Sequence, residues 1–202
     1  MKKNKISKNW LNKRKKDIYF KQSKIQGYRS RSAFKLLEMD KKFKFLNINT
    51  NLLDLGSSPG GWSQVASKKI KKGLICAIDI KSMEKITNVN FIKEDLLENE
   101  SFDKINKFFK KRIDVVISDM AANTSGNQSL DSYRTGELCL KAMYLAKKCL
   151  HKDGIFLSKL FMGSIFDEIN KKARRIFKKV VIYKPLSSKR ESKEIYIYCK
   201  GI

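Results

Sequence analysis

Short apolar runs of strand type alternate with helical patterns along most of the chain, and no other feature constrains the fold as strongly. The predicted strands cover residues 51–55, 74–80, 89–92, 113–118, 155–160, 180–183 and 194–199. The predicted helices cover residues 31–45, 62–72, 102–111, 131–150 and 164–177. Strands that alternate with helices predict an α/β fold, in which helices cover both faces of a mostly parallel sheet.

The chain carries a large excess of positive charge. Among its 202 residues, 45 are Lys or Arg and 20 are Asp or Glu, so that the net charge is +25. This excess favours a polyanionic partner, nucleic acid first, although part of it also fits the composition of a biased genome. The length suits one domain. We expect a basic N-terminal arm at residues 1–28 and a single domain at residues 29–202.

Simple sequence features argue against several kinds of protein. No apolar stretch approaches the roughly 20 residues that span a bilayer, and the first residues lack the apolar run of a signal peptide. We therefore expect a cytoplasmic protein without a membrane partner. The four cysteines are too scattered for a zinc site, and we expect reduced thiols and no metal. Because His151 is the single histidine, chemistry must depend mainly on lysines and carboxylates.

Glycines and charged residues lie within or just after several of the predicted strands. In a parallel sheet such positions share the carboxyl edge, where ligands bind. The residues concerned are Asp54, Gly56 to Gly61, Asp79, Asp95, Asp119 and Lys159. If the last strand is antiparallel, its first residue, Glu194, reaches the same edge.

A glycine-rich turn, Gly-Ser-Ser-Pro-Gly-Gly at residues 56–61, follows the first predicted strand. Such a turn lets the backbone approach a ligand and leaves helix N–H groups free for an anion. It matches neither the dinucleotide fingerprint nor the triphosphate-binding loop. Asp79 follows Gly56 by 23 residues, near the spacing at which an acid binds ribose hydroxyls, which favours an adenosine-bearing ligand. A plain tight turn is the alternative.

Four residues near this edge each have two interpretations. Asp95 either contacts an adenine amino group or is a helix cap or a solvated carboxylate. Trp62 either floors the ligand pocket or belongs to the core. Lys159 lies in an apolar strand, where an unpaired ammonium group is costly, so it is either functional or reaches solvent at the strand end. Asp119 either pairs with Lys159 or simply begins a loop.

Three segments carry recognisable motifs: residues 29–35 (RSRSAFK), 54–64 (DLGSSPGGWSQ) and 118–126 (SDMAANTSG). Together they resemble the FtsJ family of RNA 2′-O-methyltransferases, especially its bacterial members that act on uridine in large-subunit ribosomal RNA. The resemblance extends over residues 27–201. It implies a Rossmann-like class I methyltransferase fold, whose mostly parallel seven-stranded sheet contains one antiparallel strand.

The resemblance also implies S-adenosylmethionine as the cofactor. The binding positions of the family match Gly60, Trp62, Asp79, Asp95 and Asp119. The sequence departs from the family in the loop after Asp119, where relatives usually have Pro in place of Ala122. We expect this loop to be less stiff than in the relatives.

The family carries a catalytic tetrad, whose members match Lys35, Asp119, Lys159 and Glu194. Without the resemblance, Lys35 would be an ordinary solvated lysine and Glu194 a charge at a strand edge. We hypothesise that Lys159 accepts the proton of a ribose hydroxyl and that Asp119 orients Lys159 and bounds the methyl site. Lys35 and Glu194 would position the ribose.

We expect a monomer. The resemblance implies an enzyme that methylates a ribose 2′-hydroxyl of ribosomal RNA, at a uridine of the large subunit, during ribosome assembly. The residues predicted to contact RNA are the N-terminal lysines and arginines, Arg29, Arg31, Arg134 and residues 187–190. The main alternative is a non-catalytic RNA-binding or ribosome-assembly protein with the same fold, which leaves the tetrad without a function. A nicotinamide-dependent dehydrogenase would need the dinucleotide fingerprint that this turn lacks.

Overall fold

The computed structural model describes residues 17–96, 98–110, 113–123 and 125–202, so the first 16 residues of the predicted basic arm lie outside the described residues. The strands are β1 (Leu52–Leu55), β2 (Ile75–Asp79), β3 (Asn90–Lys93), β4 (Ile113–Ser118), β5 (Leu150–Phe161), β6 (Lys179–Tyr183) and β7 (Glu194–Lys200). The helices are α2 (Ile18–Ile25), α3 (Ala33–Phe43), α4 (Gly61–Lys69), α5 (Asn99–Phe109), α6 (Gln128–Cys149) and α7 (Phe166–Ile176).

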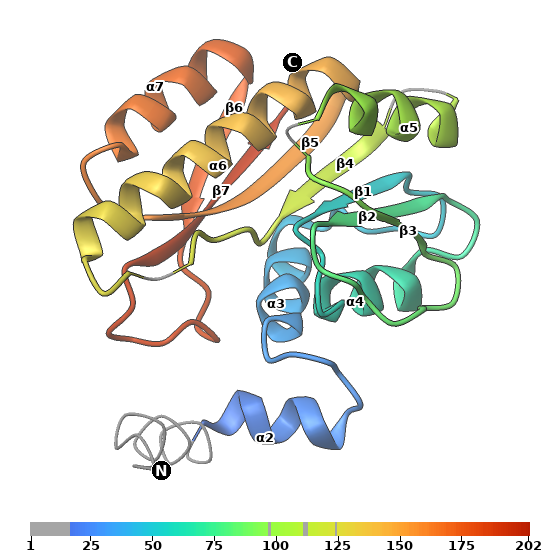
Figure 1. The fold of residues 1–202 in the computed structure, drawn as a ribbon, viewed down its shortest axis with the longest axis horizontal. Coiled ribbons are helices and arrows are strands. Elements are labelled where there is room, and N and C mark those ends of the chain that lie inside the picture. Colours follow the sequence, from blue (N-terminus) through green and yellow to red (C-terminus); the bar gives the residue numbers. More distant parts are fainter. Residues whose placement is uncertain (1–16, 97, 111–112, 124) are drawn as a thin grey trace.

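The strands form one seven-stranded sheet of order β3-β2-β1-β4-β5-β7-β6 (Figure 1). The first five strands of this order pair in parallel, whereas β7 is antiparallel to both of its neighbours, β5 and β6. The predicted fold class, a mostly parallel sheet with one antiparallel strand, is confirmed. The strand order reverses between β1 and β4, and open α/β sheets bind ligands at such a switch point.

Hydrophobic cores cover both faces of the sheet. On one face α5, α6 and α7 contribute buried residues such as Ile105 and Met143, and on the other face α3 and α4 contribute Leu36 and Val65. Figure 1 shows these two helical layers above and below the sheet. Successive strand residues alternate between the cores, which explains why the strands are continuous apolar runs in the sequence.

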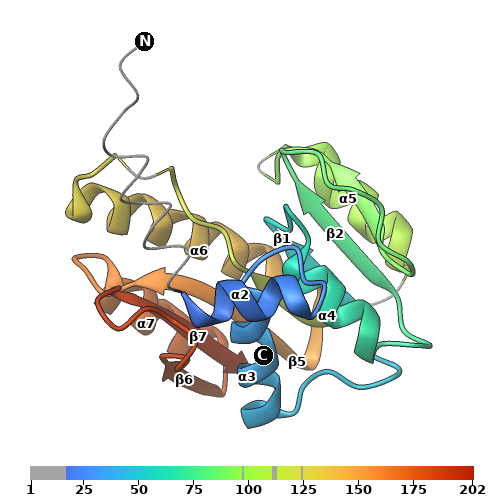
Figure 2. The same cartoon turned by 90° about the horizontal axis from the view of Figure 1, so that it is seen from below.

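Helix α2 lies outside these two layers and packs against α3 (Figures 1 and 2). The rings of Tyr19 and Phe34 are 5.5 Å apart between centroids, and Asp17 forms an ion pair with Arg31. Asp17 also accepts a hydrogen bond from the Phe20 N–H at the start of α2. The described part of the predicted arm is therefore an ordered helix.

Two element boundaries differ from the sequence prediction. Helix α6 begins before residue 131 because the Asn127 side chain accepts hydrogen bonds from the N–H groups of Ser129 and Leu130. Strand β5 begins before residue 155 because Leu150 already pairs with Ile113, across a register shift.

Among the described residues no helix is long and apolar enough to cross a membrane. The four cysteines, Cys76, Cys139, Cys149 and Cys199, are free and buried. Within the same described ranges, no group of three or more His, Cys, Asp or Glu side chains is arranged to hold a metal ion.

Candidate active site

A cleft of about 590 Å³ opens where β1, β2, β3 and β4 end, with α6 on one side. Its size falls in the range of about 300 to 1,000 Å³ that is typical of small-molecule sites. Of the five predicted cofactor positions, Asp79, Asp95 and Asp119 line this cleft. The cleft therefore lies at the switch point of the sheet, as the strand pattern predicts.

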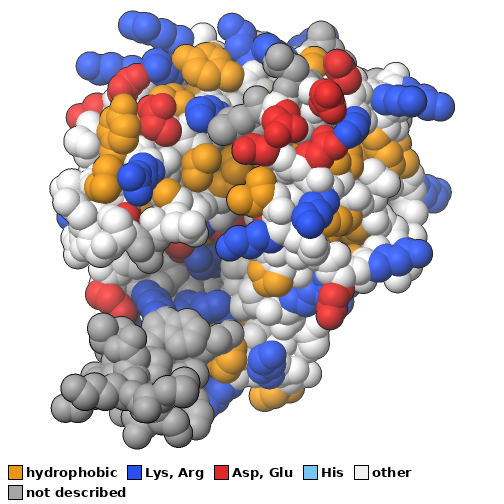
Figure 3. Space-filling view, in the orientation of Figure 1, with side chains coloured by type: hydrophobic (Ala, Val, Ile, Leu, Met, Phe, Trp, Pro, Cys, Tyr) orange, Lys and Arg blue, Asp and Glu red, His pale blue; other side chains and the backbone are white. Residues whose placement is uncertain are grey.

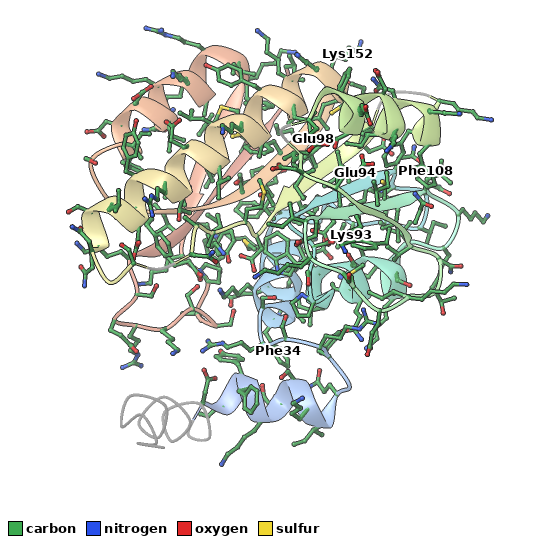
Figure 4. All side chains as sticks on the ribbon, viewed as in Figure 1. Phe34, Lys93, Glu94, Glu98, Phe108 and Lys152 are labelled. Carbon is green, nitrogen blue, oxygen red and sulfur yellow. The ribbon has the colours of Figure 1, made fainter. Side chains whose placement is uncertain are left out.

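One part of the cleft is acidic, although the protein as a whole is strongly basic. Glu94 lines the cleft where β3 ends, close to Asp95. Figure 4 labels Glu94 and Glu98 in the same region, and Figure 3 shows acidic side chains gathered there, with lysines and arginines spread over the rest of this face. Carboxylates accept hydrogen bonds from hydroxyl and amino groups, so this part of the cleft suits a nucleoside better than a phosphate.

The glycine turn forms the wall between the cleft and α4. Gly56 and Gly60 have φ angles of +72° and +108°, which side chains rarely adopt. A Cβ at Gly56 would lie 2.2 Å from Met120 Cγ, and a Cβ at Gly60 would lie 2.9 Å from Arg29 Nη1. Gly60 is also the residue that precedes the first turn of α4. The turn therefore requires glycine at both positions.

Arg29 holds this turn in place. Its guanidinium donates hydrogen bonds to the backbone oxygens of Pro59 (3.2 Å), Glu84 (2.7 Å) and Lys85 (3.0 Å). The sequence predicts Arg29 among the RNA contacts. Three of its N–H donors are used inside the protein, so Arg29 belongs to the framework of the turn, and its contact with RNA stays a prediction.

Trp62 belongs to the core, which was one of its two interpretations. Its side chain is 2% exposed, and Nε1 donates to the backbone oxygen of Ser32 at 2.9 Å. Its ring packs against that of Tyr196, with 5.8 Å between the centroids. Trp62 thus supports the wall of the site from behind.

Lys159, which is buried, and Asp119, which is half-buried, form an ion pair at the end of β4 and β5. The Lys159 Nζ lies 3.1 Å from Asp119 Oδ1 and donates to the backbone oxygen of Asp119 at 2.5 Å. Lys159 is only 8% exposed, so its side chain does not extend to solvent. The predicted pairing of these two residues is therefore present in the structure.

Tyr196 completes this pair and is the residue that sequence reasoning missed. Its hydroxyl donates to Asp119 Oδ1 at 2.8 Å, and its side chain is fully buried. Burial, together with the charges of Asp119 and Glu194, raises the pKa of Tyr196 well above its ordinary value, so the phenol stays a neutral donor. Its place two residues after Glu194 on a strand was the available signal, since such residues share a face.

Asp119 is an anion in this environment. Burial alone would raise its pKa, but the positive charges of Lys159 and Lys35 and the hydrogen bond from Tyr196 lower the pKa below the ordinary value. The carboxylate can therefore orient a neighbouring cation at neutral pH.

Lys35 and Glu194 form the second ion pair, which is buried, although they are 159 residues apart in the chain. The Lys35 Nζ lies 2.7 Å from Glu194 Oε1 and 2.8 Å from Oε2. Ser188 Oγ donates to Oε1 at 2.7 Å, and the Lys35 Nζ lies 5.8 Å from the centroid of the Tyr196 ring. Tyr196 thus lies between the two ion pairs, and the structure brings all four residues of the predicted tetrad together.

The loop after Asp119 has a tether at the position where it departs from the family. The Ala122 N–H donates to Thr135 Oγ1 on α6 at 3.3 Å. A proline has no N–H group and could not make this hydrogen bond. In this chain the Thr135 side chain therefore restrains the loop, whereas a proline would stiffen its backbone.

Asp54 lies beneath the glycine turn and is fully buried. Ser63 Oγ donates to its Oδ2 at 2.6 Å, while Oδ1 is buried without a hydrogen-bond partner. Burial raises the pKa of Asp54 to about 7; the Ser63 hydrogen bond opposes this shift, and the charges of Asp119 and Asp79 add to it.

This raised pKa predicts an unusual pH dependence of stability. The unfolded chain releases the Asp54 proton near pH 3.8, whereas the folded protein keeps it up to about pH 7. The free energy of unfolding should therefore fall as the pH rises between these values, by up to about 1.4 kcal/mol per pH unit. The described carboxyls whose pKa is lowered from ordinary values of 3.8 to 4.5, such as Asp119 and Glu38, add stability as the pH rises through those values, and this gain is nearly complete by pH 5. We expect Asp54→Asn to flatten the slope between pH 5 and 7 in urea unfolding.

The matched control is Asp153→Asn, because Asp153 is exposed at the opposite end of β5. This variant should retain the slope of the wild type. An Asp54→Asn variant with an unchanged slope would show that Asp54 is ionised in the folded protein.

Comparison with known proteins agrees with this geometry. A sequence model of the FtsJ-like methyltransferase family matches residues 28–202. The ribosomal RNA large subunit methyltransferase E of Pelagibacter ubique is 51% identical over 200 residues, which cover 99% of this chain and 98% of the relative. The protein of the same name from Rickettsia bellii is 42% identical over 197 residues, which cover 95% and 87% of the two chains.

Solved structures show the same fold. A Plasmodium falciparum protein described as a ribosomal RNA methyltransferase is 33% identical, with a TM-score of 0.79 over 87% of this chain and 98% of that chain. A Streptococcus mutans methyltransferase crystallised with SAH is 16% identical, with a TM-score of 0.53 over 82% and 95% of the two chains. At this identity the second similarity supports the fold alone.

Proposed function

Because this chain belongs to the FtsJ-like methyltransferase family, we propose that it transfers a methyl group from S-adenosylmethionine to a ribose 2′-hydroxyl of large-subunit ribosomal RNA. The observation that carries the proposal is the ion pair of Lys159 and Asp119, at the end of a cleft of nucleoside-cofactor size. We further propose that the nucleotide is a uridine, that the substrate is an assembling large subunit in the cytoplasm, and that the enzyme acts as a monomer.

The lining of the cleft fits an adenosine-bearing cofactor. Asp79 lies at the end of β2, where its Oδ2 accepts the Ser58 N–H at 2.9 Å, so the carboxylate is fixed beside the glycine turn. An acid at this place binds ribose hydroxyls. Asp95 also lines the cleft, and a carboxylate there can accept from the amino groups of such a ligand, whereas Glu94 is already engaged by Lys104 and Ser101.

Bound S-adenosylmethionine supplies a methyl group on a positively charged sulfur. The ribose oxygen would take this methyl group in place of its proton, and the demethylated cofactor, a neutral thioether, would be released. A hydroxyl is a weak nucleophile until a neighbouring group draws this proton away. The residues of this chain therefore have two tasks, which are to hold the hydroxyl and to receive its proton.

Lys159 is the residue that we assign to both tasks. An ammonium group has three N–H donors and no acceptor, so Lys159 would receive the proton as a neutral amine, whose two N–H groups stay on Asp119 and whose lone pair takes the third position. The ribose hydroxyl would donate to this lone pair. Tyr196 and Asp119 fix the lysine, and the Lys35–Glu194 pair would hold the ribose from the other side. Such positioning contributes a large part of the rate in enzymes.

The test is to incubate the protein with S-adenosylmethionine labelled on its methyl group and with ribosomal particles from cells that lack the protein. We expect label in large-subunit RNA, at one nucleotide whose 3′ linkage resists alkaline cleavage because its 2′-oxygen is methylated. Label on a base would contradict the assignment of the 2′-hydroxyl. Binding of RNA without binding of the cofactor, measured by calorimetry, would support the non-catalytic alternative.

A further inference from the structure

A second cavity lies beside the Lys35–Glu194 pair. It is small, about 180 Å³, and is lined by Arg31, Lys35, Lys189, Ser192 and Glu194. None of these residues lines the larger cleft. The cavity is smaller than the 300 Å³ or so at which small-molecule sites begin, so it suits a single functional group rather than a nucleoside.

The lining of this cavity offers donors that are unused within the protein. Among the described residues, Lys189 Nζ has no partner, and Arg31 Nε is buried without an acceptor. Ser192 Oγ accepts the Glu194 N–H at 3.1 Å, which leaves its own proton free to be donated. The carboxylate of Glu194 is already engaged by Lys35 and Ser188. The hydrogen-bonding groups that remain unused are donors, and donors bind an anion.

The wall that carries Lys189 and Ser192 is firmly held. Glu38 on α3 accepts hydrogen bonds from the N–H groups of Leu186 (2.7 Å) and Ser187 (3.1 Å) and from Ser187 Oγ (3.0 Å). Burial raises the pKa of Glu38, but these bonds and the hydrogen bond from Tyr183 lower it below the ordinary value. The loop between β6 and β7, lower left in Figure 1, is thus fixed by an anion before any ligand arrives.

Two cations also hold the loop between β6 and β7. The guanidinium of Arg31 donates to the backbone oxygen of Ser187. Lys184 Nζ donates to the backbone oxygens of Arg190 (3.1 Å) and Ser192 (2.6 Å). The side chains at the cavity therefore need little reorganisation to receive a ligand, which favours binding.

We propose that this cavity binds one backbone phosphate of the RNA, at a linkage of the target nucleotide. This inference rests on the proposed function. Lys35 joins the two sites, because it lines the cavity and its charge also lowers the pKa of the Asp119 carboxyl. A ribose held beside Lys159 would place its own phosphates close by. Lys189 and Ser192 would donate to the phosphate oxygens, and Glu194 would face the sugar. Arg31, which is already bonded to Asp17 and Ser187, would lie at the wall of the cavity.

The first test replaces Lys189 by alanine. The Lys189 side chain is exposed, so its loss should not affect folding. Its control, Lys152→Ala, removes the same charge at the far end of the sheet, where Figure 4 labels Lys152. Binding of a large-subunit RNA fragment is measured by fluorescence anisotropy at several salt concentrations. For Lys189→Ala we expect about tenfold weaker binding and a salt dependence reduced by about one phosphate contact. The control should bind like the wild type, and calorimetry should find cofactor affinity unchanged in both.

The second test places a neutral methylphosphonate at each of the two linkages that flank the methylated nucleotide. At one linkage this change should weaken binding by the wild type about as much as Lys189→Ala does, and should have little further effect on the variant. Equal losses in both proteins at both linkages, or wild-type affinity of Lys189→Ala, would overturn the phosphate site. A wild-type protein that binds RNA but transfers no methyl group would instead contradict the proposed function.

Discussion

Replacement of Lys159 by methionine is expected to slow methyl transfer by a factor of about 10² to 10⁴, the usual contribution of a positioned proton acceptor. Methionine has a similar length and packs well in apolar surroundings, but it cannot hold a hydroxyl or receive its proton. Since Lys159 is not among the residues that line the cleft beside the glycine turn, cofactor affinity should stay close to that of the wild type. Single-turnover rates with labelled methyl groups and calorimetry with the cofactor measure the two quantities.

The matched control is Lys171→Met, which removes an exposed lysine from α7 and should leave the rate unchanged. A Lys159→Met rate within a few fold of the wild type, with intact cofactor binding, would contradict the assignment of Lys159. If cofactor binding disappeared together with the rate, Lys159 would support the fold of the site rather than the transfer.

Replacement of Lys35 by methionine is expected to lower the free energy of unfolding by about 3 to 5 kcal/mol, because it leaves Glu194 charged and unpaired in a buried place. The side chains of both residues are only 11% exposed, so water compensates little. Methyl transfer should fall as well, since Lys35 would no longer position the ribose. Urea unfolding measures the stability, and the transfer assay measures the activity.

A double variant separates these two effects. Lys35→Met combined with Glu194→Gln removes the unpaired charge, while the new amide oxygen can still accept the hydrogen bond from Ser188. We expect stability to return to within about 1 kcal/mol of the wild type while activity stays low. The control Lys41→Met lies exposed on the same helix and should change stability by less than about 0.5 kcal/mol. Recovery of full activity in the double variant would show that the pair serves stability alone.

The order and type of the main elements could be predicted because the signals are local. An apolar run buried on both faces, as in β1 and β4, indicates a strand of a parallel sheet whatever its partners are. The turn at residues 56–61 is likewise visible in the sequence, since positive φ angles at Gly56 and Gly60 require glycine. Helix α6 was predicted too short because the cap formed by Asn127 lay just outside the apolar pattern.

Only some of the residues of the site could be identified from the sequence. Lys159 could be singled out because an ammonium group is costly in an apolar strand. Lys35 could not, because nothing in its own helix distinguishes it from the many other lysines, and only the family resemblance selected it. In the sequence Tyr196 is one more residue of a strand, since its hydrogen bond to Asp119 spans 77 residues.

By itself, then, the amino-acid order determined the strand and helix pattern, the glycine turn and the carboxyl edge at which ligands meet. Only the tertiary structure decided that Lys35 pairs with Glu194, that Trp62 supports the site from the core, and that Arg29 braces a turn. The reason is the range of the forces involved. Backbone preference acts over a few neighbouring residues, whereas the partner of a buried charge depends on strand order and register, which the packing of the whole sheet selects.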